Sequence, residues 1–216
     1  MIGRVTSTSG WLIGRSSIGS EGGSLPRSSP PGVVGRDARG SCDHGRVTWT
    51  LETDRLHLRP MELDDLDAFA AVVGDPYAMR FYPRAFDRSM ARAWIERTQG
   101  RYERDGFGLL SVIERATGEM IGDCGPAVQE TGHGTFVELG WHIRLDRQGN
   151  GFATEAGRAC RDQAWAALHV DRLISIIRPE NVPSWSVARA LGFRPWRGDV
   201  RVGMAHVLWS MERPDI

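Results

Sequence analysis

Lysine is absent from this sequence, and neither sign of charge is in excess. The 27 basic residues are all arginines, they are matched by 27 acidic residues, and the formal net charge is zero. A general nucleic-acid binder needs a basic surplus to neutralise phosphates, so this balance argues against such a role. The exclusive use of arginine is explained more simply by genome base composition than by chemistry, and we attach no function to it.

Long hydrophobic runs are missing and cysteine is scarce. No stretch approaches the ~20 apolar residues that a membrane-spanning helix requires, so we expect no membrane span. The three cysteines, Cys42, Cys124 and Cys160, form no Cys-x-x-Cys motif and no His/Cys cluster at zinc spacing, so we expect no metal. Reduced thiols in a cytoplasmic protein are the simplest interpretation. Cys160 falls within a helical pattern, where packing is its expected role.

The first 46 residues differ in composition from the rest of the chain. They contain ten Gly, nine Ser and three Pro, and they show no sustained apolar periodicity. Such a segment cannot bury enough surface to offset the entropy lost on ordering. They also hold six Arg against three acidic residues, which leaves the remainder mildly acidic and weakly favours a cationic partner such as an amine. We predict a disordered extension over 1–46 and one folded domain over 47–214.

Hydrophobic periodicity within residues 47–214 predicts helices among strands. The expected helices are 62–73, 87–103, 153–168 and 182–191. The expected strands are 51–59, 107–113, 120–128, 136–143, 173–177, 193–196 and 204–211. This order predicts an α/β fold, in which helices flank a mixed, mostly antiparallel sheet with one strand–helix–strand crossover.

Residues 143–156 carry a strand through a glycine-containing turn directly into a helix. The first N–H groups of a helix have no partners within the helix, and the helix dipole is positive there, so this geometry favours an anion such as a pyrophosphate. Gly149 and Gly151 would let the backbone approach a ligand without an intervening Cβ. The turn matches neither the phosphate-binding loop of nucleotidases nor the Gly-x-Gly-x-x-Gly of dinucleotide-binding proteins.

The same segment carries a family motif. The spacing Ile143-x4-Gln148-x2-Gly151-x-Ala153 resembles the acyl-CoA motif of the GNAT N-acetyltransferase superfamily. About 28 residues after Gly151 comes a run similar to the second motif of that family, which contains Asn181-x2-Ser184 and then Leu-Gly-Phe at 191–193. The segments at 138–141, 151–156 and 208–210 look like the RimJ/RimL-type branch. The resemblance covers roughly residues 50–213.

This resemblance implies the GNAT fold, with two central strands that splay apart, and acetyl-CoA as the cosubstrate. Pantetheine would lie along the backbone at Ile143 and Leu145. The pyrophosphate would be held by the segment Gln148, Gly149, Asn150, Gly151, Phe152 and Ala153, with Asn181 from the second motif nearby. Arg144, Arg147 and Arg189 are candidates for the phosphates, although each could equally be a solvated surface arginine.

The resemblance also suggests catalytic residues. A base helps to deprotonate an amine, and Glu138 is the first candidate because its strand leads into the thioester site. The alternative for Glu138 is a strand carboxylate paired with an arginine. His142 is the second choice, since it shares the face of Glu138 unless a bulge breaks the alternation. Ser184 could donate a hydrogen bond to the leaving thiol, or it could serve only the start of its helix. The tyrosine that many family members carry four residues later is Ala188 here.

These observations predict an N-acetyltransferase that moves acetyl from acetyl-CoA to a primary amine. A protein N-terminus is favoured as acceptor, and a small amine stays open. The aromatic residues at 75–83 are the expected lining of the acceptor groove, with core packing as the alternative. A catalytically silent CoA-binding domain is the competing hypothesis, because the tyrosine is missing at position 188. We expect no nucleic-acid or membrane partner, and a homodimer stays open.

Overall fold

The structure, a computed structural model, describes residues 49–214, which is the predicted folded domain apart from its first two residues. The disorder expected over residues 1–46 lies outside the described residues, and so does Cys42. Within residues 49–214, no helix has the length and apolar character needed to cross a membrane.

Eight strands and four α-helices are arranged along the described residues, with two short 3-10 helices. The strands are β1 (Leu51–Glu52), β2 (Leu56–Pro60), β3 (Leu110–Glu114), β4 (Met120–Thr131), β5 (Gly134–Ile143), β6 (Arg172–Ile177), β7 (Arg194–Arg201) and β8 (Met204–Glu212). The helices are α1 (Leu66–Val73), α2 (Arg88–Asp105), α3 (Phe152–Ala167) and α4 (Val182–Leu191), with 3-10 helices η1 (Leu63–Asp65) and η2 (Leu145–Arg147).

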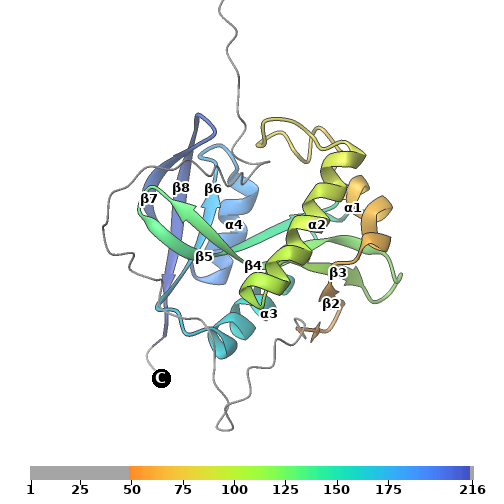
Figure 1. Ribbon diagram of the computed structural model, residues 1–216, viewed down its shortest axis with the longest axis horizontal. Coiled ribbons are helices and arrows are strands. Elements are labelled where there is room, and N and C mark those ends of the chain that lie inside the picture. Colours follow the sequence, from red (N-terminus) through yellow and green to blue (C-terminus); the bar gives the residue numbers. More distant parts are fainter. Residues whose placement is uncertain (1–48, 215–216) are drawn as a thin grey trace, which may run out of the picture.

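The strands form one sheet in the order β1-β2-β3-β4-β5-β6-β8-β7. All neighbours are antiparallel except β5 and β6, which run parallel and are joined through α3. These two strands pair only at Val137↔Leu173 and Glu138↔Ile174, although β5 continues to Ile143. Beyond Glu138 the strands diverge and the sheet opens between them (Figure 1). The predicted α/β fold with splayed central strands is therefore confirmed.

Two hydrophobic cores cover the two faces of the sheet. One contains buried residues of α3 and α4, and the other contains buried residues of α1 and α2. In Figure 1, α2 passes across the front of the sheet, whereas α4 lies behind β6. Successive residues of a strand point to opposite faces. Accordingly Val137, Leu139 and Ile143 of β5 are buried in the α3/α4 core, while Glu138 and His142 face the α1/α2 layer.

The alternation along β5 survives because its pairing with β4 is regular. The register runs without a shift from Gly122↔Ile143 to Thr131↔Gly134, and the bulge in this half of the sheet lies between β3 and β4, at Val112/Ile113. Glu138 and His142 therefore share a face of the sheet.

The expected strands differ most from those observed in two places; in addition, β3 begins at Leu110 rather than at residue 107, and β4 continues to Thr131. The single strand over 51–59 is two short strands, β1 and β2, because Thr53 closes a tight turn: its N–H donates to the Leu56 carbonyl at 2.9 Å and its hydroxyl accepts from the Leu56 N–H at 2.9 Å. The strand over 193–196 extends to Arg201, since β7 is an exposed edge strand whose polar residues carry little hydrophobic pattern. Cys160 is fully buried in the α3/α4 core, which confirms its packing role.

Candidate active site

A cavity of about 390 Å³ lies where β5 and β6 diverge. Three segments line it: residues 78–82 of the loop before α2, the end of β5 with the turn into α3, and the start of α4. This volume is typical of a small-molecule site, for which about 300–1,000 Å³ is usual. Eight of the predicted site residues line this cavity: Ile143, Gln148, Gly149, Gly151, Phe152, Ala153, Asn181 and Ser184.

The N-terminus of α3 is open toward this cavity. Its first main-chain hydrogen bond runs from the Glu155 N–H to the Gly151 carbonyl at 3.0 Å, which leaves the N–H groups of residues 152–154 without helical acceptors. The N-cap residue, Gly151, has no side chain to accept from them. By contrast, α2 is capped by the Asp87 side chain and α4 by the Asn181 side chain. The start of α3 therefore has donors to offer an anion, as the sequence predicts.

Backbone conformation requires glycine at both ends of this turn. Gly149 has φ +77° and Gly151 has φ +83°, in the left-handed region that other residues rarely adopt. No heavy atom lies within 4 Å of a Cβ built on Gly149, and one built on Gly151 meets only Nη2 of Arg55, at 3.5 Å. The space above the turn is open to a ligand.

The remaining side chains of the turn hold it in place. The Gln148 amide donates to the Ile143 carbonyl at 2.8 Å and so ties the turn to the end of β5. The Asn150 amide donates to the Arg147 and Gln148 carbonyls at 3.2 and 3.1 Å. Leu145 lies in η2, where its carbonyl accepts from the Gln148 N–H. Leu145 and Asn150 lie beside the cavity without lining it.

Arg55, the residue just before β2, holds the turn in place and was not predicted from the sequence. Its guanidinium donates to the Asn150 carbonyl at 3.0 Å and to Glu155 at 2.7 Å, and it lies 4.5 Å from the centre of the Phe152 ring. Burial disfavours the charged form of Glu155, but hydrogen bonds from Thr53 and Arg55 outweigh it and lower the pKa of Glu155. An arginine next to a strand carries no local signal of a contact with a turn about 95 residues away.

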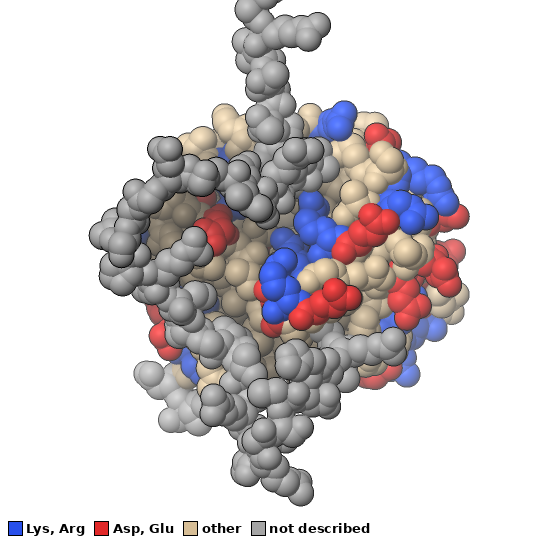
Figure 2. Space-filling model, viewed as in Figure 1, with Lys and Arg blue, Asp and Glu red and all other residues tan. Residues whose placement is uncertain are grey.

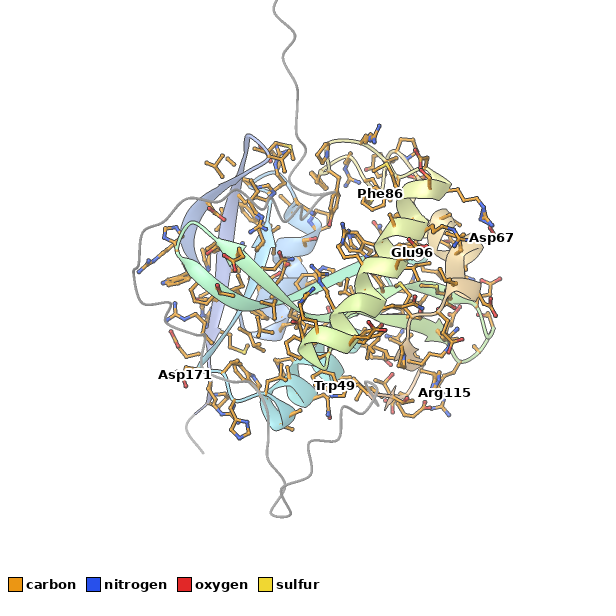
Figure 3. The ribbon with its side chains drawn as sticks, in the orientation of Figure 1. Trp49, Asp67, Phe86, Glu96, Arg115 and Asp171 are labelled. Atoms are coloured by element: carbon orange, nitrogen blue, oxygen red, sulfur yellow. The ribbon has the colours of Figure 1, made fainter. Side chains whose placement is uncertain are left out.

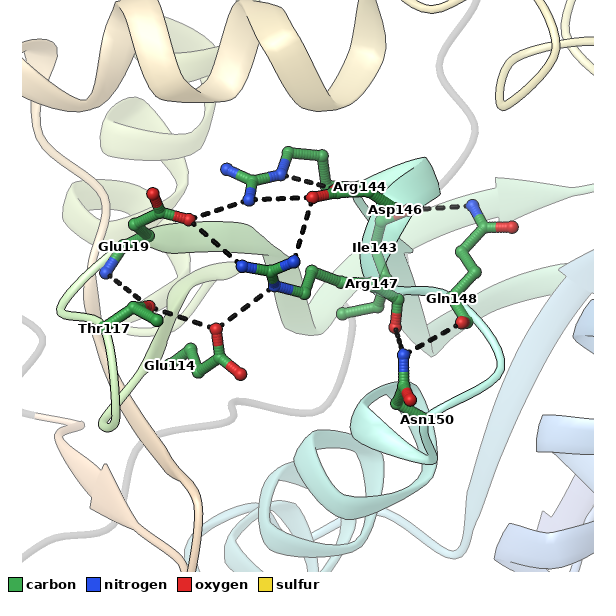
Figure 4. A network of polar contacts seen from close by, with 9 residues as sticks. All are labelled: Glu114, Thr117, Glu119, Ile143, Arg144, Asp146, Arg147, Gln148 and Asn150. Atoms are coloured by element: carbon green, nitrogen blue, oxygen red, sulfur yellow. Dashed lines mark hydrogen bonds and ion pairs between the residues drawn. The ribbon is translucent and has the colours of Figure 1, made fainter.

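Two of the three candidate phosphate arginines belong to an ion-pair network (Figure 4). Arg144 contacts Glu119 at 2.8 Å and Asp146 at 2.7 Å, while Arg147 contacts Glu114 at 3.2 Å. Arg147 nevertheless lines the cavity. Arg189 lies at α4, with its guanidinium 5.8 Å from the Trp209 ring centre.

A second, smaller cavity of about 70 Å³ lies on the α2 side of β5. Glu138 and Arg101 both line it. Glu138 accepts hydrogen bonds from the Gln129 amide at 2.7 Å and from the Ile176 N–H at 3.2 Å, and burial raises the pKa of this carboxyl group. Burial lowers the pKa of the Arg101 guanidinium. Arg101 belongs to α2, and Figure 2 shows basic side chains near the centre of the viewed face with acidic side chains beside them.

The two cavities meet at five shared residues. Their common lining is Tyr82, Trp141, His142, Asn181 and Ser184. The Asn181 side chain accepts from the Ser184 N–H at 3.2 Å, so Asn181 caps α4 as it faces both cavities. Ala188 is fully buried, and the position where many family members carry tyrosine therefore contributes only to the core.

A chain of three side chains reaches this junction from the interior. Asp123 of β4 is fully buried, and its Oδ1 lies 2.6 Å from His142 Nδ1. His142 Nε2 lies 2.7 Å from the Tyr82 hydroxyl. The Trp94 indole N–H donates to the second oxygen of Asp123 at 3.1 Å. Phe86, beside the N-terminal end of α2 in Figure 3, packs against both Tyr82 and Trp94.

The clustering of Asp123, Trp94 and Tyr82 was not predicted from the sequence. One signal was present: Asp123 is an acidic residue within the otherwise apolar strand 120–128, and carboxylates are rarely buried without a partner. The loop at 75–83 does line the larger cavity, through residues 78–82. Among the described residues, no group of three or more His, Cys, Asp or Glu side chains is arranged to hold a metal ion.

These features define a mixed α/β protein with a cleft between two diverging parallel strands, beside a helix start that can bind an anion. The family described as acetyltransferase (GNAT) domain matches residues 55–194. The chain belongs to this GNAT acetyltransferase family.

Similar proteins agree with this assignment. The uncharacterized protein YkkB of Bacillus subtilis is 31% identical over 159 residues, which cover 70% of this chain and 92% of YkkB. The structure of an acetyltransferase from Agrobacterium tumefaciens is 27% identical, with a TM-score of 0.67 over 76% of this chain and 94% of that one. The RimL ribosomal L7/L12 alpha-N-protein acetyltransferase in complex with coenzyme A shares the fold at 15% identity, with a TM-score of 0.63 over 76% of this chain and 98% of that one.

Proposed function

We propose that this protein transfers the acetyl group of acetyl-CoA to a primary amine by direct attack of the amine on the thioester. The observation that carries the proposal is the meeting of two cavities at Tyr82, His142 and Ser184. The larger cavity adjoins the uncapped start of α3 and suits coenzyme A, whose pyrophosphate would accept from the N–H groups of residues 152–154. The smaller cavity would bring the amine to the same junction.

The acceptor we favour is a protein N-terminus. The smaller cavity, at about 70 Å³, suits the amine end of an acceptor rather than a whole bulky molecule. The likeness to the RimL alpha-N-protein acetyltransferase supports the same class of acceptor. A small primary amine would satisfy the same cavity, so the assay must include both.

Glu138 is the base that we propose for the incoming ammonium group. Its carboxyl group lines the smaller cavity, and burial raises its pKa. A raised pKa brings a carboxylate closer to the pKa of the amine that it must deprotonate and so makes it a better proton acceptor. The hydrogen bonds from Gln129 and Ile176 leave further lone pairs of the carboxylate for a water or the ammonium group itself.

Ser184 is the donor that we propose for the departing sulfur. Ser184 lines both cavities, and its position in the helix is fixed by the Asn181 cap. A thiol with a cysteine-like pKa of about 8.5 needs only modest help to leave, and a hydrogen bond from Ser184 would contribute to that help.

The competing function is a CoA-binding domain without catalysis. The absence of a tyrosine at position 188, which is alanine, favours this alternative. The test is release of CoA thiol from acetyl-CoA, measured across N-terminal peptides and small amines, with mass spectrometry to find the acetylated nitrogen. Amine-dependent thiol release with an N-acetylated product supports the transferase. Binding of acetyl-CoA without turnover on any amine would establish the silent domain instead.

A further inference from the structure

We infer that Tyr82, His142 and Asp123 form a proton relay, in which the Tyr82 hydroxyl takes the proton of the attacking amine and returns it to the departing sulfur. This inference rests on the proposed acetyl transfer. It assigns to Tyr82 the role of general acid toward the sulfur, which Ala188 cannot fill. Tyr82 comes from the loop before α2, on the other side of the groove from α4.

The relay ends where the reacting groups would meet. Tyr82 and His142 line both cavities, whereas Asp123 lies behind them with no exposed surface. Both ring nitrogens of His142 are hydrogen-bonded within the relay, so the Tyr82 hydroxyl is the member that would exchange a proton with a substrate, and His142 and Asp123 act through it.

The hydrogen-bond donors follow from the chemistry of the partners. An indole N–H only donates, so Asp123 accepts from Trp94 on one oxygen. We assign Asp123 as a carboxylate that accepts from His142 Nδ1–H on its other oxygen, at 2.6 Å. His142 Nε2 is then the acceptor for the Tyr82 O–H, at 2.7 Å. A phenol hydroxyl can accept as well as donate a hydrogen bond, which is what the relay requires of Tyr82.

One cycle of the relay balances the reaction. As the amine nitrogen bonds to the acetyl carbon, its N–H proton passes to the Tyr82 oxygen, and the Tyr82 proton passes to His142 Nε2. The resulting imidazolium is stabilised by the Asp123 carboxylate. When the C–S bond breaks and sulfur takes the bonding electron pair, Tyr82 gives its proton to sulfur and recovers one from His142. The amine has lost one proton, the thiol has gained one, and the relay is restored.

The surroundings suit a relay better than a lone tyrosine. Burial, together with Glu138 and Asp123, raises the pKa of Tyr82, so a free tyrosinate is disfavoured and its proton must be replaced as it leaves. Burial lowers the pKa of His142, but Asp123 and Glu138 outweigh burial and raise it overall. The groups facing His142 are Asp123 from β4, Glu138 from its own strand, Tyr82 from the loop and the neutral Trp94 from α2.

Tyr82→Phe tests the relay because it removes the hydroxyl and keeps the ring that packs on His142 and Phe86. We expect kcat to fall by about 10²–10⁴, with the KM for acetyl-CoA unchanged. Tyr77→Phe is the matched control: Tyr77 lies in the same loop, is 61% exposed and should leave kcat unaltered. His142→Gln should lose a similar factor, and the double variant no more than either, since the residues act as one unit.

Asp123→Asn tests whether Asp123 acts on the pKa of His142, because a purely structural role of Asp123 would not shift the pH–rate profile. Without the Asp123 charge the pKa of His142 should fall, so the acidic limb of the pH–rate profile should move to lower pH while kcat decreases. The shift can be followed independently by NMR titration of the His142 ring.

The outcomes separate the relay from the function on which it rests. An active parent whose Tyr82→Phe variant keeps its kcat overturns the relay alone, as do losses in Tyr82→Phe and His142→Gln that multiply in the double variant. Circular dichroism shows whether each variant is folded, and if Tyr82→Phe is not, His142→Gln decides. A parent that transfers acetyl to no amine overturns the proposed function and the relay together.

Discussion

Replacing Gly151 with valine isolates what the turn before α3 contributes to ligand binding. A Cβ at this position meets only the tip of Arg55, at 3.5 Å, which is an ordinary van der Waals contact. Its cost in stability is the strain of a β-branched residue at φ +83°, which we place at about 1–3 kcal/mol. For a domain of this size, that corresponds to a fall in Tm of roughly 2–12 °C.

The cost in affinity should be larger. A valine at residue 151 stands beside the uncapped N–H groups at the start of α3, which we propose as donors to the pyrophosphate. Each hydrogen bond to a charged group is worth about 1.5–3 kcal/mol. The loss of two such bonds is about 3–6 kcal/mol and would raise the Kd for acetyl-CoA by roughly 10²–10⁴.

Gly118→Val is the matched control for this variant. Gly118 has φ +72° in the turn between β3 and β4, and nothing lies within 4 Å of its Cβ position, so it should incur similar strain away from the groove. Both variants would be titrated calorimetrically with acetyl-CoA and with pantetheine, which lacks the pyrophosphate. Gly151→Val should lose affinity for acetyl-CoA far more than for pantetheine, and Gly118→Val for neither. A folded Gly151→Val protein with the parent's Kd for acetyl-CoA would refute the pyrophosphate role of the turn.

Three further predictions concern catalysis and stability. Glu138→Gln should lower the rate by about 10²–10⁴ if Glu138 is the base. Because burial raises the pKa of Glu138 in the folded state, the ionised carboxylate destabilises the fold. The Tm of Glu138→Gln relative to that of the parent should therefore increase as the pH rises through that pKa. An unchanged pH–rate profile would contradict the catalytic role. Burial disfavours the charged form of Asp65, but hydrogen bonds from Arg59, a main-chain N–H and a serine hydroxyl outweigh it and lower the pKa of this carboxyl group. Ionised Asp65 therefore stabilises the fold above its unfolded pKa of about 3.9, and this stabilisation is lost as the pH falls through the folded pKa. Asp65→Asn should therefore cost about 2–3 kcal/mol at pH 7 and much less in acid, measured by denaturant titration; an equal loss at both pH values would exclude the charge as the cause. A chain that begins at Arg46 keeps the Trp49 ring, which stacks on the core at 6.2 Å from Phe107, and should match the full chain in Tm and acetyl-CoA affinity; a large fall in Tm would show that the extension packs on the domain.

The sequence by itself determined the features that depend on neighbours in the chain. The turn at residues 148–153 is recognisable because its glycines, its preceding strand and its following helix are contiguous, and the structure places Gly149 and Gly151 at positive φ, which glycine adopts most readily. The Asn181 cap of α4 is equally local, since the cap and the N–H that it accepts from are three residues apart. Periodicity likewise determined which face of β5 carries Glu138.

Tertiary structure alone decided what surrounds those features. Asp123 and His142 are 19 residues apart, and they meet because β4 and β5 pair without a register shift. Tyr82 and His142 are 60 residues apart, and their contact depends on how the loop before α2 folds over the sheet. The carboxylate partners of Arg144 and Arg147, Glu119 and Glu114, are likewise brought to them by packing between segments that are distant in the chain. Such contacts cannot be predicted from local residue spacing, because each residue fits its own helix, strand or loop whichever partner the tertiary packing places beside it.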